Sequence, residues 1–348
     1  MREFFRESVL GDFDQRDSSD VFGVGSIPRV DNTLQVPFHS PTSSTTCAVV
    51  VTYHPSEDLF DRINRVTEQV DRAVIVDNGS PTSCIEWLKA AADGRRVHLI
   101  LNRRNEGVAH ALNQGAKWAA DQGYAWAFTL DQDTLIDEDA LKSLFAVHEA
   151  FPQNEELAVI GSNYTDPRTG RPLLRPNTRR RSPWKEEKTV ITSGSLLSLS
   201  AYSAIGPFRE EFFIDCVDFE YCLRARSRSF RVVLACRPSM QHVIGATTMH
   251  TVLRKTTGTS NHIPTRRYYM TRNLLVLVRE YLTTEPAWVL SSLSTHLKST
   301  VAMLLFEDHK LFKLKYLVMG MMDGLFSNFK RNLTLQDPRI ESPRVGQL

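Results

Sequence analysis

The sequence predicts an α/β fold in which helices cover both faces of a mostly parallel central sheet. Short, continuously apolar runs alternate with stretches whose apolar residues recur at helical spacing, and polar residues follow the apolar runs. Continuous runs rich in β-branched residues are typical of strands that are buried on both faces. Regular alternation of such strands with helices gives a parallel sheet with right-handed connections.

The alternation begins at Cys47, after a polar segment that ends in "HSPTSSTT". In the first helical stretch, Leu59, Ile63, Val66 and Val70 repeat at helical spacing. Strands are expected at 47–53, 97–102 and 125–130, and within 73–80 a strand that stops at Asp77 before a turn; helices are expected at 56–70, 83–93 and 108–122.

The second half of the chain is less regular. A basic, proline-containing loop is expected between the first two strands of this half. The expected elements are strands at 157–164 and 189–200, a loop at 165–188, a short helix at 201–206, a segment at 212–227 that turns from extended to helical, a strand within 231–246 that ends near His242, and mainly helical chain from 268 to 330.

Composition is that of an ordinary folded protein. The 348 residues are 42% hydrophobic and 24% charged, and the formal net charge is +2. This small charge gives no overall preference for polyanions, so no nucleic-acid partner is expected. Five cysteines without a CxxC pair argue against a disulfide framework or a zinc site and favour a reducing compartment. No apolar run is long enough for a signal peptide or a membrane span, so a cytoplasmic location is expected.

Two acids at the end of one predicted strand suggest a metal site. In "AFTLDQDTLIDEDAL", residues 127–141, Asp131 follows the strand and Asp133 comes two positions later. Residues two apart on a strand point to the same side, and like charges held close together repel unless a cation lies between them. Carboxylates are ligands that Mg²⁺ and Mn²⁺ prefer. The alternative is a solvated turn in which these acids cap the next helix.

Polar residues also end the neighbouring predicted strands. Asp77, Asn78 and Asn102 join Asp131 at the carboxyl ends of one parallel sheet, where ligands bind in such folds. The chain contains no G-x-x-x-x-G-K-[ST] sequence, so it is not a P-loop enzyme. It also lacks G-x-G-x-x-G after the first strand, so dinucleotide binding is not indicated. A nucleoside diphosphate held by a metal ion fits these observations.

Four segments resemble, in order and spacing, the nucleotide-binding half of family 2 glycosyltransferases, which have the GT-A fold. They are "VVVTYHPSEDL", "VIVDNGS", "NRRNEGVAHALNQGAKWA" and "TLDQDT". The segment "GPFREEFFIDCVDFEYCLRARS" resembles the acceptor side of the family. "RRYYMTRN", at 266–273, resembles a segment of bacterial rhamnosyltransferases of the rhamnolipid and O-antigen type, which act in rhamnolipid and lipopolysaccharide synthesis.

This resemblance covers residues 46–280 and implies a division of the chain. The implied parts are an N-terminal extension at 1–45, a GT-A catalytic domain at 46–265, and C-terminal helices with a tail at 266–348. Within the catalytic domain, residues 46–135 would form the nucleotide-binding half and residues 136–265 the acceptor half.

The resemblance also implies roles on the donor side. Thr52 and Tyr53 would line the base and ribose pocket. Asp77 would accept a hydrogen bond from N3–H of the pyrimidine; the alternative is a carboxylate that caps the turn at Gly79-Ser80.

Further donor-side roles follow for the segment "NRRNEGVAHALN". Asn105 and Asn113 would orient the nucleotide. Gly107 would allow its close approach to a helix N-terminus, whose dipole favours an anion. Arg103 or Arg104 would contact the nucleotide, with a solvated surface charge as the alternative for either.

Asp131 and Asp133 resemble the DxD motif of the family. This implies that Asp133 binds Mg²⁺ or Mn²⁺, and that Asp131 binds the ribose or reaches the metal through water. His242, in "MQHVIG", would complete the metal coordination. The alternative for His242 is a strand-end histidine whose partners are backbone groups.

Asp218 is expected to be the general base that acts on the acceptor. The acids of the family pattern occur here as Val217-Asp218-Phe219-Glu220, without the first acid, so Asp215 and Glu220 compete for the role. Desolvation by the apolar neighbours should raise the basicity of Asp218.

Three other residues on this side have expected roles. Arg224 would form a salt bridge within its own segment. Arg272 and Asn273 would contact the diphosphate or the acceptor, with a structural role as the alternative.

The implied reaction is inverting transfer of a sugar, L-rhamnose from dTDP-L-rhamnose, to a hydroxyl of a glycolipid or polysaccharide precursor. One alternative is a UDP-sugar donor, and another is a non-catalytic GT-A module that binds a nucleotide. A nucleotidyltransferase would need a glycine-rich, basic stretch near the first strand, which "VTYHPSEDL" lacks.

The C-terminal region carries two apolar runs with lysines among them. Leu290, Leu297 and Leu305 belong to the stripe of the first run, which is expected to pack against the rest of the protein. The second run, at 306–330, is expected to hold the enzyme at the inner face of the cytoplasmic membrane. A homodimer is the alternative use of these helices.

Overall fold

The computed structural model describes residues 39–92, 96–175, 182–242, 248–252, 255–331 and 333. These residues belong to one compact unit. The expected N-terminal extension lies outside the described residues up to residue 38, as do residues 176–181 of the basic loop and the tail from residue 334.

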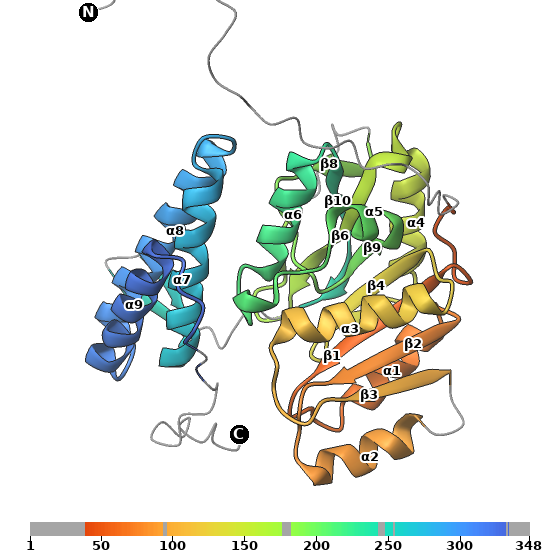
Figure 1. The fold of residues 1–348 in the computed structure, drawn as a ribbon, viewed down its shortest axis with the longest axis horizontal. Coiled ribbons are helices and arrows are strands. Elements are labelled where there is room, and N and C mark those ends of the chain that lie inside the picture. Colours follow the sequence, from red (N-terminus) through yellow and green to blue (C-terminus); the bar gives the residue numbers. More distant parts are fainter. Residues whose placement is uncertain are drawn as a thin grey trace, which may run out of the picture. The chain divides into compact units, whose positions relative to one another are not determined.

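The half of the chain that is predicted to bind the nucleotide is a four-stranded parallel sheet with helices packed on it (Figure 1). Its strands lie in the order β3-β2-β1-β4. The predicted elements are confirmed, although the first helix begins three residues later than expected, because residues 56–58 form a turn in which Leu59 N donates to Ser56 O at 3.1 Å. The elements are β1 (Thr46–Thr52), α1 (Leu59–Thr67), β2 (Arg72–Asp77), α2 (Thr82–Ala92), β3 (Val97–Leu101), α3 (Val108–Asp121) and β4 (Trp126–Asp131).

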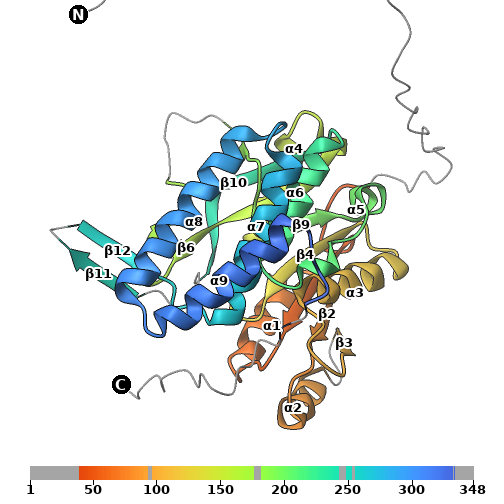
Figure 2. The ribbon, with the colours of Figure 1, turned by 60° about the vertical axis from the view of Figure 1, so that its left-hand side comes forward.

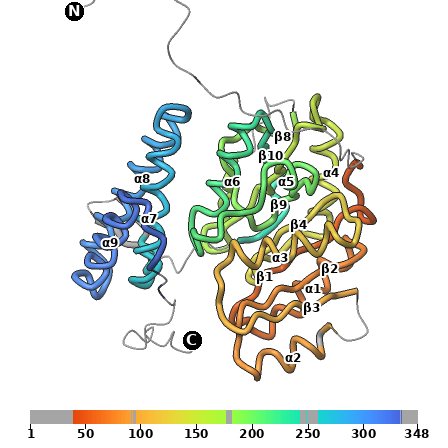
Figure 3. The backbone as a smooth tube through the Cα atoms, in the orientation of Figure 1, coloured from red at the N-terminus to blue at the C-terminus, as the bar shows by residue number. Residues whose placement is uncertain are grey.

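The second half extends this sheet, and Figure 3 follows the path of the chain. The full strand order is β3-β2-β1-β4-β9-β6-β10-β5. β9 is antiparallel to both β4 and β6, whereas β10 is parallel to β6. The sheet is therefore mostly parallel, as predicted, with one reversed strand inside it. The added strands are β5 (Leu135–Ile136), β6 (Leu157–Asp166), β7 (Arg171–Pro172), β8 (Trp184–Glu186), β9 (Ser195–Ser198) and β10 (Arg231–Gln241).

One predicted strand is shorter than expected. The strand expected at 189–200 is reduced to β9, because the Ser198 side chain accepts from Ala201 N at 3.2 Å and starts helix α5 (Leu199–Ile205). The strand expected to end near His242 is confirmed, since β10 ends at Gln241. A hairpin of β11 (Thr248–Val252) and β12 (Lys255–Thr259) was not predicted.

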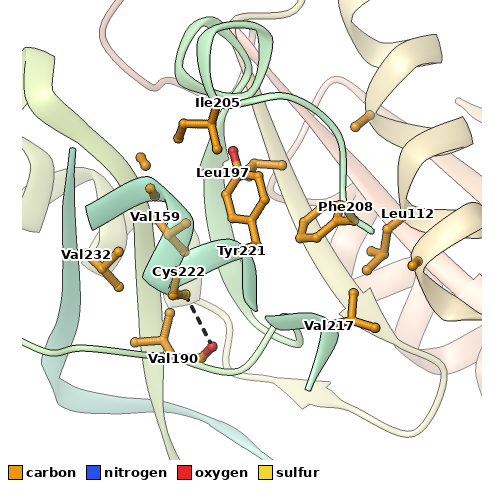
Figure 4. Packing of buried hydrophobic residues seen from close by; sticks show 14 of the residues in the cluster. Leu112, Val159, Val190, Leu197, Ile205, Phe208, Val217, Tyr221, Cys222 and Val232 are labelled. Carbon is orange, nitrogen blue, oxygen red and sulfur yellow. Dashed lines mark hydrogen bonds between the residues drawn. The ribbon is translucent and has the colours of Figure 1, made fainter. Parts of the chain in front are cut away.

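The sheet separates two apolar cores. Along β1, Val49 belongs to one core and Val50 to the other, as expected for a strand buried on both faces. One core contains residues of α1 and of α4 (Ala140–Ala150), and the other contains residues of α3, α5 and α6 (Val217–Ser227). Figure 4 shows part of the second core, where Tyr221 of α6 packs against Phe208 with ring centroids 4.5 Å apart. These cores fix α6, whose first turn carries Asp218.

Three helices complete the described chain, and Figure 2 brings them forward. They are α7 (Pro264–Tyr281), α8 (Pro286–Phe306) and α9 (Lys310–Leu325). α9 packs closely along α7 because two of its glycines leave room for the α7 backbone. A Cβ at Gly320 would lie 2.4 Å from Tyr268 O, and one at Gly324 would lie 2.7 Å from Arg272 O.

The outer surfaces of α8 and α9 are apolar. The prediction that the first apolar run packs against the protein is wrong for much of α8, because Leu290, Leu297, Val301, Leu304 and Leu305 are exposed. By length and composition, α8 is long and apolar enough to cross a membrane, with a mean hydropathy of 1.2 over 18 residues. The prediction that no segment is long and apolar enough for a membrane span is therefore corrected. α9 leaves a second apolar stripe exposed: Leu311, Val318, Met321, Met322 and Leu325.

Candidate active site

Asp131, Asp133 and His242 come together at the carboxyl edge of the sheet. Asp131 ends β4, Asp133 lies in the turn that follows, and His242 comes directly after β10. One possible ligand atom from each residue lies within 4.8 Å of the other two. Two carboxylates and an imidazole are a suitable donor set for a divalent cation such as Mn²⁺. These three side chains thus converge as the sequence predicts.

A short hydrogen-bonded chain orients this group. Ser193 Oγ accepts from Asp131 N at 3.0 Å and lies 2.6 Å from Thr134 Oγ1. Thr134 Oγ1 in turn lies 3.0 Å from Nδ1 of His242. The alternative of a histidine satisfied by backbone groups is not what the structure contains. Nothing in the sequence pattern pointed to Ser193 or Thr134.

The middle residue of the DQD sequence links the turn after β4 to the residue that follows β1. Gln132 Oε1 accepts from Tyr53 N at 2.8 Å, and Gln132 Nε2 donates to Tyr53 O at 3.1 Å. These two bonds hold the turn that carries Asp133 against the end of β1.

Burial raises the pKa of Asp131 to about 6, and the charge of Asp133 adds to the increase. His242 and Arg266 act in the opposite direction. A carboxylate that is costly to ionise in isolation gains most from a bound cation. The raised pKa of Asp131 therefore agrees with a cation-binding role for these three side chains.

Asp77 caps a turn, which was the alternative to its predicted contact with a pyrimidine. Its side chain is fully buried, and both carboxylate oxygens are occupied. Oδ1 accepts from Thr52 Oγ1 at 3.0 Å and from Ser80 Oγ at 2.6 Å, and Oδ2 accepts from Gly79 N at 3.2 Å and Ser80 N at 2.8 Å. The predicted bond to N3–H of a base is not available in this arrangement.

A ladder of side-chain amides continues from this turn to the loop before α3. Asn102 Nδ2 donates to Asn78 Oδ1 at 3.2 Å and to Gln114 Oε1 at 2.8 Å. Asn78 Nδ2 donates to Asn105 Oδ1 at 3.0 Å, and the same oxygen accepts from Gly107 N at 2.9 Å. Asn105 therefore shapes the loop at the predicted donor crevice.

Two predictions for α3 are corrected. Asn113 does not face the nucleotide side, because Nδ2 donates to Phe208 O and Glu210 Oε1, both at 2.9 Å. Gly107, at φ 92°, does allow a close approach, but the approaching group is the chain at Phe213 rather than an anion. A Cβ at Gly107 would lie 2.6 Å from Phe213 O, which accepts from Val108 N at 2.7 Å.

The two candidate arginines differ in their surroundings. Arg104 forms an exposed ion pair with Glu106, Nε to Oε1 at 2.7 Å, so the surface alternative describes it. Arg103 is exposed beside it.

Asp218 is the second residue of α6 and is partly buried. Its Oδ1 accepts from Phe219 N at 2.9 Å. Burial raises the pKa of Asp218 to about 7; the charges of Asp215 and Asp131 also raise it, while the Phe219 N–H lowers it. The environment thus makes this carboxylate basic near neutral pH.

The two competing acids have cationic partners. Arg266 binds Asp215 with Nη2 to Oδ1 at 3.1 Å, and Arg224 binds the buried Glu220 with Nε to Oε1 at 2.7 Å. The predicted salt bridge of Arg224 is therefore confirmed. Over the described ranges, Asp218 forms no ion pair, which distinguishes it from both competitors.

Arg266 is a site residue that the sequence analysis missed. Burial alone would lower the pKa of Arg266, but Asp215, and farther away Asp131 and Asp133, raise it. Its place at the start of α7 brings one cation near these three acids. The only sequence signal was its position in "RRYYMTRN".

Arg272 and Asn273 have the structural role that was the alternative to ligand contact. Both are buried in α7. Arg272 Nη2 donates to Glu211 O at 2.6 Å, and its guanidinium lies 4.9 Å from the centroid of the Tyr269 ring. The prediction that Arg272 binds the donor is corrected.

The chain is similar in sequence to known glycosyltransferases. Residues 47–205 match the family described as glycosyl transferase family 2. The dTDP-rhamnosyl transferase RfbF of Shigella flexneri is 30% identical over 253 residues, which is 68% of this chain and 81% of that protein. The resemblance to bacterial rhamnosyltransferases expected from the motifs is therefore confirmed.

Two solved structures have a similar fold. S. aureus TarS 1-349 in complex with UDP-GlcNAc has a TM-score of 0.54 and 15% identity, with 80% of each chain covered. The mannosyltransferase PcManGT from Pyrobaculum calidifontis, in complex with GDP-Man and Mn²⁺, has a TM-score of 0.50 and 14% identity, with 81% of this chain and 87% of that chain covered. The chain belongs to glycosyltransferase family 2 and has the GT-A fold, followed by three C-terminal helices.

Proposed function

We propose that this glycosyltransferase moves L-rhamnose from dTDP-L-rhamnose to a hydroxyl of a saccharide or glycolipid acceptor, with inversion at the anomeric carbon. The observation that carries the reaction is Asp218, whose pKa is raised to about 7 by burial, with a contribution from the charge of Asp131 in the Asp131–Asp133–His242 group. The choice of donor is supported by the likeness to the RfbF dTDP-rhamnosyl transferase.

In the proposed step, Asp218 accepts the proton of the acceptor hydroxyl while that oxygen attacks the anomeric carbon. A new glycosidic bond forms as the bond between that carbon and the phosphate oxygen breaks, and the nucleoside diphosphate leaves with the electron pair. One base suffices for a single displacement of this kind. A glycosidase would instead need two carboxyl groups on either side of the scissile bond.

A cation held by Asp131, Asp133 and His242 would supply positive charge that stabilises the leaving diphosphate. The residues of this chain prepare for it, since Ser193 bonds to the backbone of Asp131 and Thr134 bonds to the His242 side chain at the sheet edge. Asp131 would reach the ion through a water molecule or bind the ribose.

The nucleotide would lie beyond the carboxyl ends of β1, β2 and β3. Tyr53 and the loop held by Asn105 would border it. Thr52 and Asp77 would act indirectly, because their side chains bond to each other under this surface.

A donor screen tests this proposal. Purified protein with Mn²⁺ is incubated with labelled dTDP-L-rhamnose, UDP-glucose, UDP-GlcNAc and GDP-mannose, each with saccharide and lipid-linked acceptors. Release of dTDP and labelling of an acceptor from dTDP-L-rhamnose alone are expected. Transfer from a UDP-sugar would replace the donor assignment, and binding of nucleotides without any release would indicate a non-catalytic module.

We also propose that the apolar face of α8 and α9 lies on an anionic membrane surface, which would place the enzyme near a lipid-linked acceptor. The support is the distribution of charge around the exposed leucines. Glu307 and Asp323 point inward, where Lys313 Nζ lies 2.8 Å from Glu307 Oε2 and Arg331 Nε lies 2.9 Å from Asp323 Oδ2. The cations left at the surface of these helices are Lys298, Lys310 and Lys315.

Flotation with phosphatidylglycerol vesicles tests this placement. Lys310→Glu with Lys315→Glu should reduce the bound fraction several-fold, and Lys89→Glu with Lys142→Glu on the catalytic domain should not. Lys313 is unsuitable for this test because it is buried in an ion pair. If the protein stays unbound and sediments as a dimer that Leu297→Glu dissociates, a second copy covers the face instead.

A further inference from the structure

The segment before Asp218, residues 212–216, has an unusual backbone and is here called the base loop. Phe213, Asp215 and Cys216 have φ angles of 63°, 64° and 60°. At Phe213 the ψ angle is −64°, and Ile214 N donates to Phe212 O at 2.7 Å, which makes a strained γ-turn. Non-glycine residues keep such angles only where the surroundings hold them.

Asn273 of α7 supplies much of that hold. Its side chain is fully buried, and Nδ2 donates toward three base-loop carbonyl oxygens, at 2.9 Å for Phe212, 2.9 Å for Ile214 and 2.8 Å for Asp215. An amide nitrogen has two hydrogens, so the three carbonyls share them. Asn273 Oδ1 accepts from Arg272 Nε at 2.9 Å, which sets the direction in which the amide faces.

The other side of the base loop is fastened to the donor half. Phe213 O accepts from Val108 N, and Gly107 makes room for the chain there. The Phe213 ring stacks on Tyr269 of α7 with centroids 5.0 Å apart. The loop is therefore held between α3 and α7, and α6 with Asp218 follows it directly.

We propose that Asn273 is a positioning residue for sugar transfer: its amide holds the base loop in the strained conformation that presents Asp218 to the acceptor. This inference rests on the proposed function, in which Asp218 is the base. Asn273 itself touches neither substrate. Its loss should let the loop relax and move the carboxylate, while the nucleotide site, built from other segments, stays intact.

Asn273→Ala tests the proposal against a matched control on the same helix. Tyr268→Phe also removes a buried hydrogen bond of α7, that of Tyr268 to Asp323 Oδ2 at 2.8 Å, but on a side chain that does not bond to the base loop. Both variants should lower the melting temperature. Only Asn273→Ala should lower kcat with dTDP-L-rhamnose, by roughly 10–100-fold for a carboxylate displaced by about 1 Å. The dissociation constant for dTDP with Mn²⁺ should stay within about two-fold of the wild-type value, as expected when only transition-state interactions are lost.

Two further measurements keep the outcome clear. Hydrogen exchange of a peptide covering residues 208–218 should be faster in Asn273→Ala than in Tyr268→Phe, whatever the enzyme's substrate is. Adding Cys216→Gly, which removes one unfavourable positive φ, should recover part of the stability lost in Asn273→Ala. An unchanged kcat and unchanged exchange in a folded Asn273→Ala protein would overturn the proposal. Absence of transfer by the wild-type enzyme would instead refute the proposed function, and the exchange data would still decide whether Asn273 holds the loop.

Discussion

Asp77 and Asp218 are two carboxylates in the same domain with opposite surroundings. Asp77 accepts four hydrogen bonds at the end of β2 and has no exposed surface. Asp218, at the start of α6, accepts one backbone N–H and forms no ion pair with the described residues, and burial raises its pKa to about 7. A carboxylate with all its acceptor positions filled stabilises the fold, whereas one left partly unsatisfied is costly and available to a ligand.

This contrast extends to the regions around them. On the donor side, Asn78, Asn102 and Asn105 satisfy one another. Elsewhere in the site, burial raises the pKa values of both Asp131 and Asp218, and neither acid forms an ion pair with the described residues. Polar residues of the site therefore divide into those satisfied within the protein and those that the proposed reaction would use.

Of the changes that separate the satisfied acids from the unsatisfied ones, removal of the divalent cation should have the largest effect on sugar transfer. With EDTA, transfer from dTDP-L-rhamnose should stop, and Mn²⁺ should restore it, because Asp131 and Asp133 then lack the cation that offsets their charges. Asp133→Ala should raise the Mn²⁺ concentration needed for half-maximal activity, and the exposed Glu138→Ala should not. Full activity in EDTA would remove the metal from the account.

The pH dependence should be the next largest effect. A base must be deprotonated, so kcat should fall about tenfold per pH unit below the pKa of Asp218. That pKa is about 7 in the free protein, and the charge of Asp131 contributes to it. Because a bound cation offsets that charge, the acidic side of the pH–rate profile should have its midpoint at or below pH 7. A rate that does not change from pH 5 to 8 would mean that Asp218 is not the base.

Gly107→Ala should have a smaller effect on kcat, and it should disturb both the start of α3 and the base loop. The new Cβ would lie 2.6 Å from Phe213 O, and the positive φ adds a backbone cost, about 1–3 kcal/mol for such strain. Gly123→Ala is the matched control, since Gly123 also has a positive φ but nothing within 4 Å of the added Cβ. Both variants should lose stability, and we expect a lower kcat only in Gly107→Ala. Equal kcat values in the two variants would show that the base loop tolerates displacement.

Asp77→Asn should have the smallest effect on turnover and a clear effect on stability. The amide cannot accept all four bonds, so the free energy of unfolding should fall by about 1–3 kcal/mol. Urea denaturation measures this loss, and kcat of the folded fraction should change little. A stable variant with weaker dTDP binding would return Asp77 to the nucleotide pocket.

Much of the fold was predictable because buried strands and amphipathic helices leave a direct pattern in the sequence. The alternation from β1 to β4 is an example, and so is the convergence of Asp131, Asp133 and His242 at one edge. The reversed direction of β9 was not predictable, since direction depends on which strand it pairs with and not on its own composition.

Side-chain partners were less predictable than strand ends. Asp77 and Asp218 are both acids beside apolar segments, and only the folded chain shows that Thr52 and Ser80 satisfy the first. The pairing of Arg266 with Asp215 joins positions 51 residues apart, which no local pattern reports. The exposure of α8 was also missed, because an apolar stripe has the same spacing whether it faces a core or the outside.

The central claim is that Asp218 is kept unsatisfied for catalysis, and Asp218→Asn tests it most directly. The folded-state pKa of about 7 lies above the ordinary value of 3.8, so stability falls as pH rises from 4 through 7, and the full cost of the charge is present at pH 8. The account predicts that at pH 8 the variant loses turnover by roughly 10²–10⁴-fold, keeps its affinity for dTDP, and melts at a higher temperature than the wild type. Below pH 4, where wild-type Asp218 is protonated in both the folded and the unfolded state, the melting temperatures should nearly coincide. A variant that is less stable at pH 8, or one that keeps wild-type turnover, would contradict the account.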